Sequence, residues 1–172
     1  YDLDATVDGR GSKGALHLYN KFHMEHPSNM FVLEYASRPP LAKIFYEDVL
    51  MAAVYYGYEI LIENNKYGIA RYFENRGYDG YLMDRPEHLK STARVAVKTK
   101  GIPSNSQDVI QAHAQSIEAY IHEHIGLNEL GDYGRMYFER TLEDWINFKI
   151  DNRTKYDLTI SSGLALLAAQ RV

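Results

Sequence analysis

Two acidic residues occupy positions where an ionised carboxylate needs compensation, and together they suggest metal chemistry. Glu63 follows the apolar run "ILI" at residues 60–62 and precedes two asparagines. An acid at the end of a buried strand is costly unless a cation or hydrogen-bond donors stabilise it. Asp157 opens the segment "DLTISSGLALLAAQ", where the dipole and the N–H groups of a helix start favour an ionised carboxylate.

Carboxylate oxygens are hard ligands, which makes these acids candidates for binding Mg²⁺ or Mn²⁺. Two metal ions about 4 Å apart need several converging carboxylates, so a third acid is expected from the N-terminal segment. Asp2, Asp4 and Asp8 are the candidates there. The alternative interpretations are structural: Asp157 would be an ordinary N-cap, and Glu63 would pair with a neighbouring lysine or arginine.

The first third of the chain predicts a β-hairpin followed by a helix. Residues 15–22 ("ALHLYNKF") and 29–37 ("NMFVLEYAS") are strand-like, and "HMEHPSN" supplies turn residues between them. Residues 41–56 carry apolar side chains at helical spacing before Gly57, which predicts a helix with one buried face. The apolar positions are Leu41, Ile44, Phe45, Val49, Ala52 and Tyr56.

The later elements place both acids. Residues 58–65 ("YEILIENN") predict a central strand that is covered on both faces. The small residues of the last helix, residues 155–170, favour close packing on a sheet, which would bring Asp157 toward the end of the Glu63 strand. The other expected elements are a helix over 67–78, a short strand over 79–84, an amphipathic helix over 105–126, and a strand-like start running into a helix over 135–150.

Length and composition describe a globular protein. At 172 residues, with no repeat or linker, the chain is expected to form a single domain over residues 1–172. Hydrophobic residues make up 45% and charged residues 24%, which argues against disorder. No apolar run approaches the roughly 20 residues of a membrane helix, so no membrane association is expected. The absence of cysteine excludes disulfides and thiol catalysis, and the net charge of −4 disfavours nonspecific coating of nucleic acid.

Four segments carry a resemblance to a known family. "LIENNKYGIARYF" joins a strand-end acid and asparagines to a Gly-containing helix start, and "YDLTISSGLALLAA" is an Ala-rich closing helix led by an aspartate. "EYASRPP" and "KTKGIPSNS" match a strand-to-helix entry and a loop before a long helix. Over nearly its whole length the chain resembles the ribonuclease H-like nuclease domain of phage terminase large subunits. The resemblance implies an α/β fold with a ribonuclease H-like mixed β-sheet flanked by helices.

The resemblance also implies a ligand set. Glu63, Asp157 and Asp4 would be the catalytic carboxylates and would bind two Mg²⁺ or Mn²⁺ ions. Asp2, or an acid that precedes Tyr1, is the alternative to Asp4, because some relatives carry this acid in an Asp-Pro-Tyr-Asp run. Tyr156 stands where the family often has a second acid beside the one matched by Asp157.

The implied activity is metal-dependent hydrolysis of double-stranded DNA, an endonuclease that cuts concatemeric DNA during genome packaging. Phosphate contacts are expected from a strip between His88 and Gln107 that has no acidic residue. A solvated surface loop is the alternative interpretation of this strip. Its basic residues are Lys90, Arg94, Lys98 and Lys100.

The family's other components are expected outside this sequence. "DGRGSKGA" lacks the G-x-x-x-x-G-K-[ST] spacing of a phosphate-binding loop, so an ATPase domain is expected upstream in a longer chain. The implied partners of that longer protein are the portal and the small terminase subunit, and the implied location is the cytoplasm of a phage-infected host cell. Two alternatives remain: a catalytically silent module that binds DNA or a portal, and another ribonuclease H-like nuclease such as a junction resolvase.

Overall fold

The structure, a computed structural model, describes residues 13–21, 28–65, 67–87, 99–103, 107–125 and 136–170. These residues have a mixed α/β architecture with five α-helices and a two-stranded antiparallel sheet, which confirms the predicted α/β class. They form two compact units. The first unit takes its described residues from Tyr1–Arg38 and Ala112–Gln170, and the second from Pro39–Gln111. No helix in the described ranges is long and apolar enough to cross a membrane.

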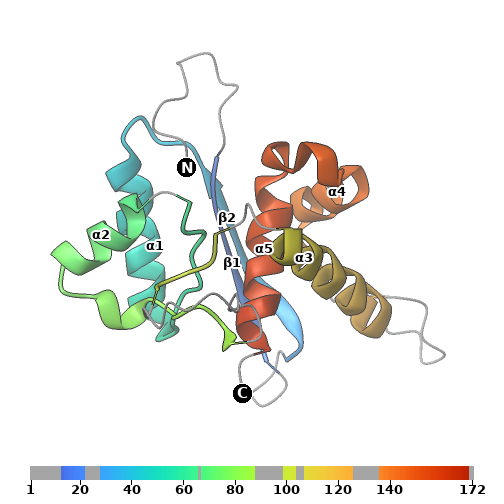
Figure 1. The fold of residues 1–172 in the computed structure, drawn as a ribbon, viewed down its shortest axis with the longest axis horizontal. Coiled ribbons are helices and arrows are strands. Elements are labelled where there is room, and N and C mark those ends of the chain that lie inside the picture. Colours follow the sequence, from blue (N-terminus) through green and yellow to red (C-terminus); the bar gives the residue numbers. More distant parts are fainter. Residues whose placement is uncertain are drawn as a thin grey trace. The chain divides into compact units, whose positions relative to one another are not determined.

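A β-hairpin forms the sheet of the first unit, as predicted. β1 (Gly14–Asn20) and β2 (Met30–Ser37) pair in antiparallel direction along their length, as Figure 1 shows. The register shifts by one residue between Leu18 and Tyr19, which leaves Val32 as the extra residue of β2. A bulge of this kind bends the strand and increases its twist.

Helices pack against this hairpin within the first unit. α5 (Asp157–Ala169) contacts both β1 and α4 (Glu139–Asn147). α3 (Gln107–Tyr120), which belongs to the first unit from Ala112 onward, continues into a single π-helical turn over Ile121–Ile125. A 3₁₀ helix over Ile150–Lys155 leads into α5. Residues 136–138 precede α4 without belonging to a strand, so the strand-like start predicted there is wrong at these positions.

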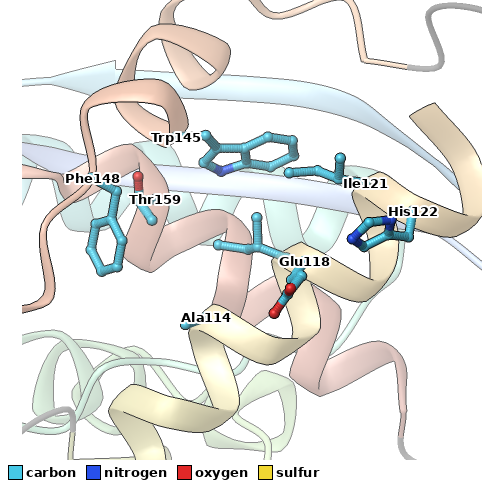
Figure 2. A pocket seen from close by; sticks show the side chains of 8 residues that line it. Ala114, Glu118, Ile121, His122, Trp145, Phe148 and Thr159 are labelled. Atoms are coloured by element: carbon cyan, nitrogen blue, oxygen red, sulfur yellow. The ribbon is translucent and has the colours of Figure 1, made fainter. Parts of the chain in front are cut away.

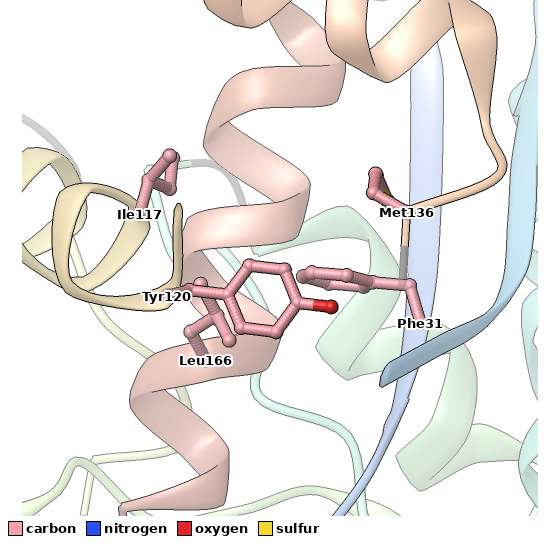
Figure 3. Close-up of a cluster of buried hydrophobic side chains, with 5 residues drawn as sticks. All are labelled: Phe31, Ile117, Tyr120, Met136 and Leu166. Carbon is pink, nitrogen blue, oxygen red and sulfur yellow. The ribbon is translucent and has the colours of Figure 1, made fainter. Parts of the chain in front are cut away.

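An aromatic cluster fills the core of the first unit, as Figure 3 shows. Phe31 of β2 is 1% exposed, and its ring meets that of Tyr120 edge to face with centroids 5.2 Å apart. The Trp145 ring of α4 also meets both of these rings, with its centroid 6.1 Å from that of Phe31 and 6.2 Å from that of Tyr120. Each such ring pair adds about 0.5–1.5 kcal/mol to the free energy gained from burial. The buried members of the cluster are Phe31, Ile117, Tyr120, Met136 and Leu166.

The small residues of α5 allow close packing, as the sequence predicted. Ser162 is fully buried and accepts a hydrogen bond of 2.9 Å from the indole N–H of Trp145. A Cβ atom on Gly163 would lie 3.2 Å from the Cβ of His113 in α3, so a larger residue would push against that helix. α5 therefore packs closely against His113 of α3 and Trp145 of α4, and it also contacts β1.

The second unit begins with α1 (Ala42–Tyr56), which ends at Gly57 with a left-handed φ of 72°. The predicted helix is confirmed, but its buried face differs from the predicted one. The side chains at four-residue spacing on the buried face are Phe45, Val49 and Ala53. Successive helical residues are rotated by about 100°, so the neighbours of these residues turn outward. The residues expected in the core that are exposed instead are Leu41, Ile44 and Tyr56.

Short paired segments stand where two strands of the second unit were predicted. α2 (Gly68–Asn75) confirms the helix expected between them. The second segment starts with a 3₁₀ turn over Asp79–Tyr81, so its backbone pairing begins only at the carbonyl of Tyr81, which accepts the Ile60 N–H at 2.7 Å. The predicted strands are therefore reduced to isolated bridges. The bridges are Ile60 with Leu82 and Glu63 with Ile102 in parallel direction, and Asp84 with Lys100 in antiparallel direction.

Candidate functional site

Asp157 is the first residue of α5, and its side chain is half-buried. Its carboxylate oxygen Oδ2 accepts a hydrogen bond of 2.7 Å from the backbone N–H of Lys13, which directly precedes β1. The N-cap position of α5 is Tyr156, whose side chain makes no capping hydrogen bond. Asp157 is thus inside the helix rather than at its N-cap, and it joins the helix start to the hairpin.

A different acid caps α5. Asp144 of α4 accepts a hydrogen bond of 3.1 Å from the backbone N–H of Leu158, and Thr159 N–H also bonds to this carboxylate. The pKa of Asp144 is raised, mainly by burial and to a smaller extent by the negative charge of Glu34. The two N–H groups and the positive charge of Lys13 act in the opposite direction. The start of α5 therefore has two carboxylates near it, one on its own first turn and one supplied by α4.

A chain of hydrogen bonds links β1, β2, α4 and α5 inside the first unit. The Thr141 hydroxyl donates to Oε2 of Glu34 at 2.6 Å, so its oxygen accepts from His17 Nε2–H at 2.7 Å. His17 Nδ1 is then an acceptor for the Ser161 hydroxyl at 3.0 Å. Glu34 also accepts the backbone N–H of Thr141 at 3.1 Å, with Arg140 3.7 Å from its other oxygen. Every polar atom of this chain is satisfied when His17 is neutral.

His17 is suited to a structural role. Its side chain is 7% exposed, and burial lowers the pKa of its imidazole from 6.5 to about 3. A histidine with this pKa stays neutral near neutral pH, and both of its ring nitrogens already have partners. His17 therefore holds the strand to two helices and is not available as a proton-transfer group.

Glu63 belongs to the second unit, at the end of a segment that has neighbours on both sides. Ile102 N–H donates to the carbonyl of Ile62 at 2.9 Å, and Asn64 N–H donates to the carbonyl of Ile102 at 2.8 Å. The Glu63 side chain is half-buried and accepts a hydrogen bond of 2.7 Å from the Asn65 amide. Among the described residues it makes no ion pair.

The asparagines that follow Glu63 are explained by this arrangement. Asn64 donates from its side chain to the carbonyl of Lys100 at 2.6 Å, and Asn65 holds the Glu63 carboxylate. Gly101 has a left-handed φ of 76° and lies against the carbonyl of Ile62, where a Cβ atom would collide. The two amides and Gly101 thus fix the end of the segment around Glu63.

Lys100 is the one residue of the predicted basic strip that falls within the described ranges. Its ammonium lies 3.0 Å from Asp84 and donates to the carbonyl of Leu82 at 2.8 Å. This lysine therefore stabilises the paired segments of the second unit in addition to any contact with phosphate. The other residues of the strip, Lys90, Arg94 and Lys98, lie outside the described residues.

Asp4, the third predicted acid, lies outside the described residues. Its alternatives Asp2 and Asp8 lie outside them too. Within the described ranges, no group of three or more histidine or acidic side chains is placed to hold a metal ion. Asp157 belongs to the first unit and Glu63 to the second. Each by itself offers the hard oxygen ligand that Mg²⁺ or Mn²⁺ prefers.

Two polar residues of this region were not singled out from the sequence, Asp144 and Glu34. Asp144 lies within "TLEDWINF", where an acid on an amphipathic helix reads as a solvated surface residue. Glu34 lies in a strand, and its partner Thr141 is 107 residues away along the chain. A sequence pattern does not contain such long-range contacts, so only the folded structure identifies these residues.

Comparisons of this chain with models of protein families, with curated proteins and with solved structures found no match.

Proposed function

We propose that this chain is a metal-dependent DNA endonuclease domain with a ribonuclease H-like fold, of the kind found in phage terminase large subunits. Glu63, Asp157 and the N-terminal acid Asp4 are the proposed ligands of two Mg²⁺ or Mn²⁺ ions. Bound there, the ions would supply a water of lowered pKa and charge stabilisation for the leaving oxygen. The residues of the chain position the carboxylates and admit the DNA backbone.

The observation that carries the proposal is the set of partners of the Glu63 carboxylate. This acid ends a segment with backbone partners on two sides, yet among the described residues it has an amide and no cation as its partner. A half-buried carboxylate without a countercharge is stabilised by a bound cation. Asn65 orients the carboxylate by one oxygen, as the supporting groups around metal ligands do.

Asp157 supports the proposal in a second way. The capping of α5, the structural task that would explain an acid at this position, belongs to Asp144. Asp157 instead has one oxygen held by the Lys13 backbone. The positive end of the helix dipole favours its ionised form, which is the form that binds metal.

The order of elements supports the fold proposed. A β-hairpin is followed by α1, by a segment that pairs in parallel with residues on the far side of α2, and by a closing helix led by Asp157. Parallel pairing on either side of a helix is the connection found in α/β sheets. A ribonuclease H-like sheet has the same sequence of a hairpin, a helix and parallel strands.

Nicking of supercoiled plasmid DNA in the presence of Mn²⁺ tests the activity. We expect the protein to nick DNA with Mn²⁺ and not with chelator, and Glu63→Gln and Asp157→Asn to lower the rate by about 100-fold or more, because each removes a charged ligand. Glu74→Gln, which changes an exposed acid of α2, is the matched control and should keep full activity. Circular dichroism of each variant checks that the fold is retained.

Two results would contradict the proposal. Nicking that persists in both ligand variants would mean that other groups, or a contaminant, cleave the DNA. No nicking by any variant, together with DNA binding that weakens as salt rises, would favour the catalytically silent binding module.

A further inference from the structure

Asp157 and Ser161 lie one turn apart on the same side of α5, and each is hydrogen-bonded to the segment that contains β1. The backbone N–H of Lys13 donates to Asp157 at 2.7 Å, and the Ser161 hydroxyl donates to Nδ1 of His17 at 3.0 Å. Residues four apart on a helix are neighbours on one face. A single bond would leave the helix free to turn about it, whereas two bonds at different heights fix the rotation of α5 against β1.

The apolar packing of α5 does not select this rotation by itself. Two of its buried residues, Leu158 and Leu164, point in different directions around the helix axis. Thr159 points in a third direction, where it lines an apolar pocket beside Trp145 and Phe148, as Figure 2 shows. Because most sides of α5 are apolar, a rotated helix would still bury apolar side chains, and burial discriminates only weakly between rotations.

The hydrogen bond between Ser161 and His17 does discriminate between rotations. His17 is 7% exposed and its Nε2–H donates to Thr141, so Nδ1 needs a donor on its other side. A rotation that moved Ser161 away would leave this nitrogen buried and unpaired, which is unfavourable. The imidazole cannot follow the hydroxyl, because Thr141 is itself held by Glu34. A buried polar contact of this kind sets the register between packed elements.

We propose that Ser161 and His17 are positioning residues for Asp157. Their hydrogen bond fixes the rotation of α5 and thereby holds the Asp157 carboxylate against the Lys13 N–H, which occupies one of its oxygens. The inference rests on the proposed function, in which Asp157 is a metal ligand. Groups that orient a metal ligand without touching the ion typically change metal affinity by about 10- to 100-fold.

The orientation of Asp157 is testable without metal, through the amide proton signal of Lys13 in NMR spectra recorded with EDTA. This amide donates to a carboxylate, a strong type of hydrogen bond that displaces the signal downfield. Asp157→Ala removes the acceptor and gives the reference position of the unbound amide. We expect Ser161→Ala to move the Lys13 signal toward that reference. Ser161→Thr, which keeps a hydroxyl, should leave the signal near its wild-type position.

Mn²⁺ binding tests the consequence for the proposed metal site. Electron paramagnetic resonance measures the free ion, and we expect Ser161→Ala to raise the Kd for Mn²⁺ about tenfold and Ser161→Thr to restore most of the affinity. Asp157→Asn removes the charged ligand itself. In that background Ser161→Ala should have no further effect, because Ser161 acts through Asp157.

Ser162→Ala is the matched control, since it removes a hydroxyl from the adjacent position of the same helix. Ser162 accepts its hydrogen bond from Trp145 of α4 and so does not join α5 to β1. We expect this variant to keep the wild-type Lys13 signal and the wild-type Mn²⁺ affinity, although it also loses stability. Urea unfolding compares the stability of the two alanine variants. Equal changes of the Lys13 signal in both would assign Ser161 a merely structural role and overturn the inference.

The outcomes distinguish this inference from the proposed function. A Lys13 signal that does not move in Ser161→Ala would overturn the inference, whatever the metal measurements show. A Kd for Mn²⁺ that rises in Asp157→Asn but not in Ser161→Ala would also overturn it and would leave the proposed metal site intact. Wild-type protein that binds no Mn²⁺ would contradict the proposed metal site, while a Lys13 signal that moves in Ser161→Ala would still establish that Ser161 orients Asp157.

Discussion

Asp144 and Asp157 divide between them two tasks that a sequence pattern assigns to one residue. An aspartate at a helix start usually caps that helix, but here the cap comes from Asp144 on a neighbouring helix. Asp157 is thereby left to bond the Lys13 backbone. The two acids should therefore respond differently to substitution: Asp144 through stability, and Asp157, under the proposed function, through metal binding.

Asp144→Ala should lower the free energy of unfolding by about 1 kcal/mol, because the first turn of α5 loses its acceptor. Asp144→Asn should be at least as stable as the wild type at pH 7. The amide oxygen still accepts the Leu158 N–H. Burial disfavours the charged carboxylate, as the raised pKa of Asp144 shows, and the neutral amide avoids this cost. Urea unfolding of the three proteins measures this order. An alanine variant as stable as the wild type would show that the cap contributes nothing.

At the residue scale, the sequence singled out two carboxylates as candidate ligands and missed the polar groups that join distant elements. Glu63 and Asp157 stand out because each falls at the end or start of an apolar element. Asp144, Glu34 and Thr141 act through contacts between segments far apart in the chain, which local patterns do not encode. Whether Asp4 completes the site stays a prediction, because it lies outside the described residues.

Among the elements, the paired segments of the second unit depend on one glycine. Gly101 has φ near 76° and lies directly against the carbonyl of Ile62, which itself accepts the N–H of Ile102. A side chain here would meet two obstacles at once, the left-handed backbone and a fixed backbone atom. Gly57 has nearly the same φ of 72° but open space around it.

Gly101→Ala should therefore destabilise the protein more than Gly57→Ala. The Gly57 variant bears only the backbone cost, about 1 kcal/mol, whereas the Gly101 variant must also displace Ile62 or break its hydrogen bond. Thermal unfolding of both variants beside the wild type makes the comparison. Equal losses in the two variants would mean that the segment relaxes around the new methyl group at no cost.

Helices were easier to predict than strands in this chain, for a physical reason. A helix makes its hydrogen bonds within one segment, so the spacing of Phe45 and Val49 and the stop at Gly57 suffice to place α1. A strand needs partners, and the apolar run at residues 60–62 does not reveal that each neighbour pairs only briefly. The hairpin was predictable because its two strands are adjacent in sequence.

At the scale of the molecule, two buried neutral histidines link stability to acid. Burial lowers the pKa of His17 from 6.5 to about 3, and that of His113 from 6.5 to about 4, with a smaller contribution from Arg153 to the latter. Both belong to the first unit. In the unfolded chain each titrates near pH 6.5, so the unfolded state binds more protons below that pH.

The stability of the first unit should therefore be complete above about pH 6.5 and decline as the pH falls toward 4. Each histidine contributes a slope of about 1.4 kcal/mol per pH unit over this window. Urea unfolding between pH 7 and pH 5 measures the decline, and NMR of the ring signals should find neither histidine titrating in the folded protein. Replacement of each by asparagine assigns the signals. Normal titration of either ring near pH 6.5 would contradict the expectation.

The order of the two units along the chain has a consequence for biosynthesis. Residues 39–111 form the second unit without interruption, whereas the first unit joins segments from both ends of the sequence. On the ribosome, the second unit can complete its fold while the hairpin still waits for α5 to emerge. Until Leu166 is made, Phe31 has no complete core to enter, so the nascent chain exposes aromatic surface that chaperones recognise.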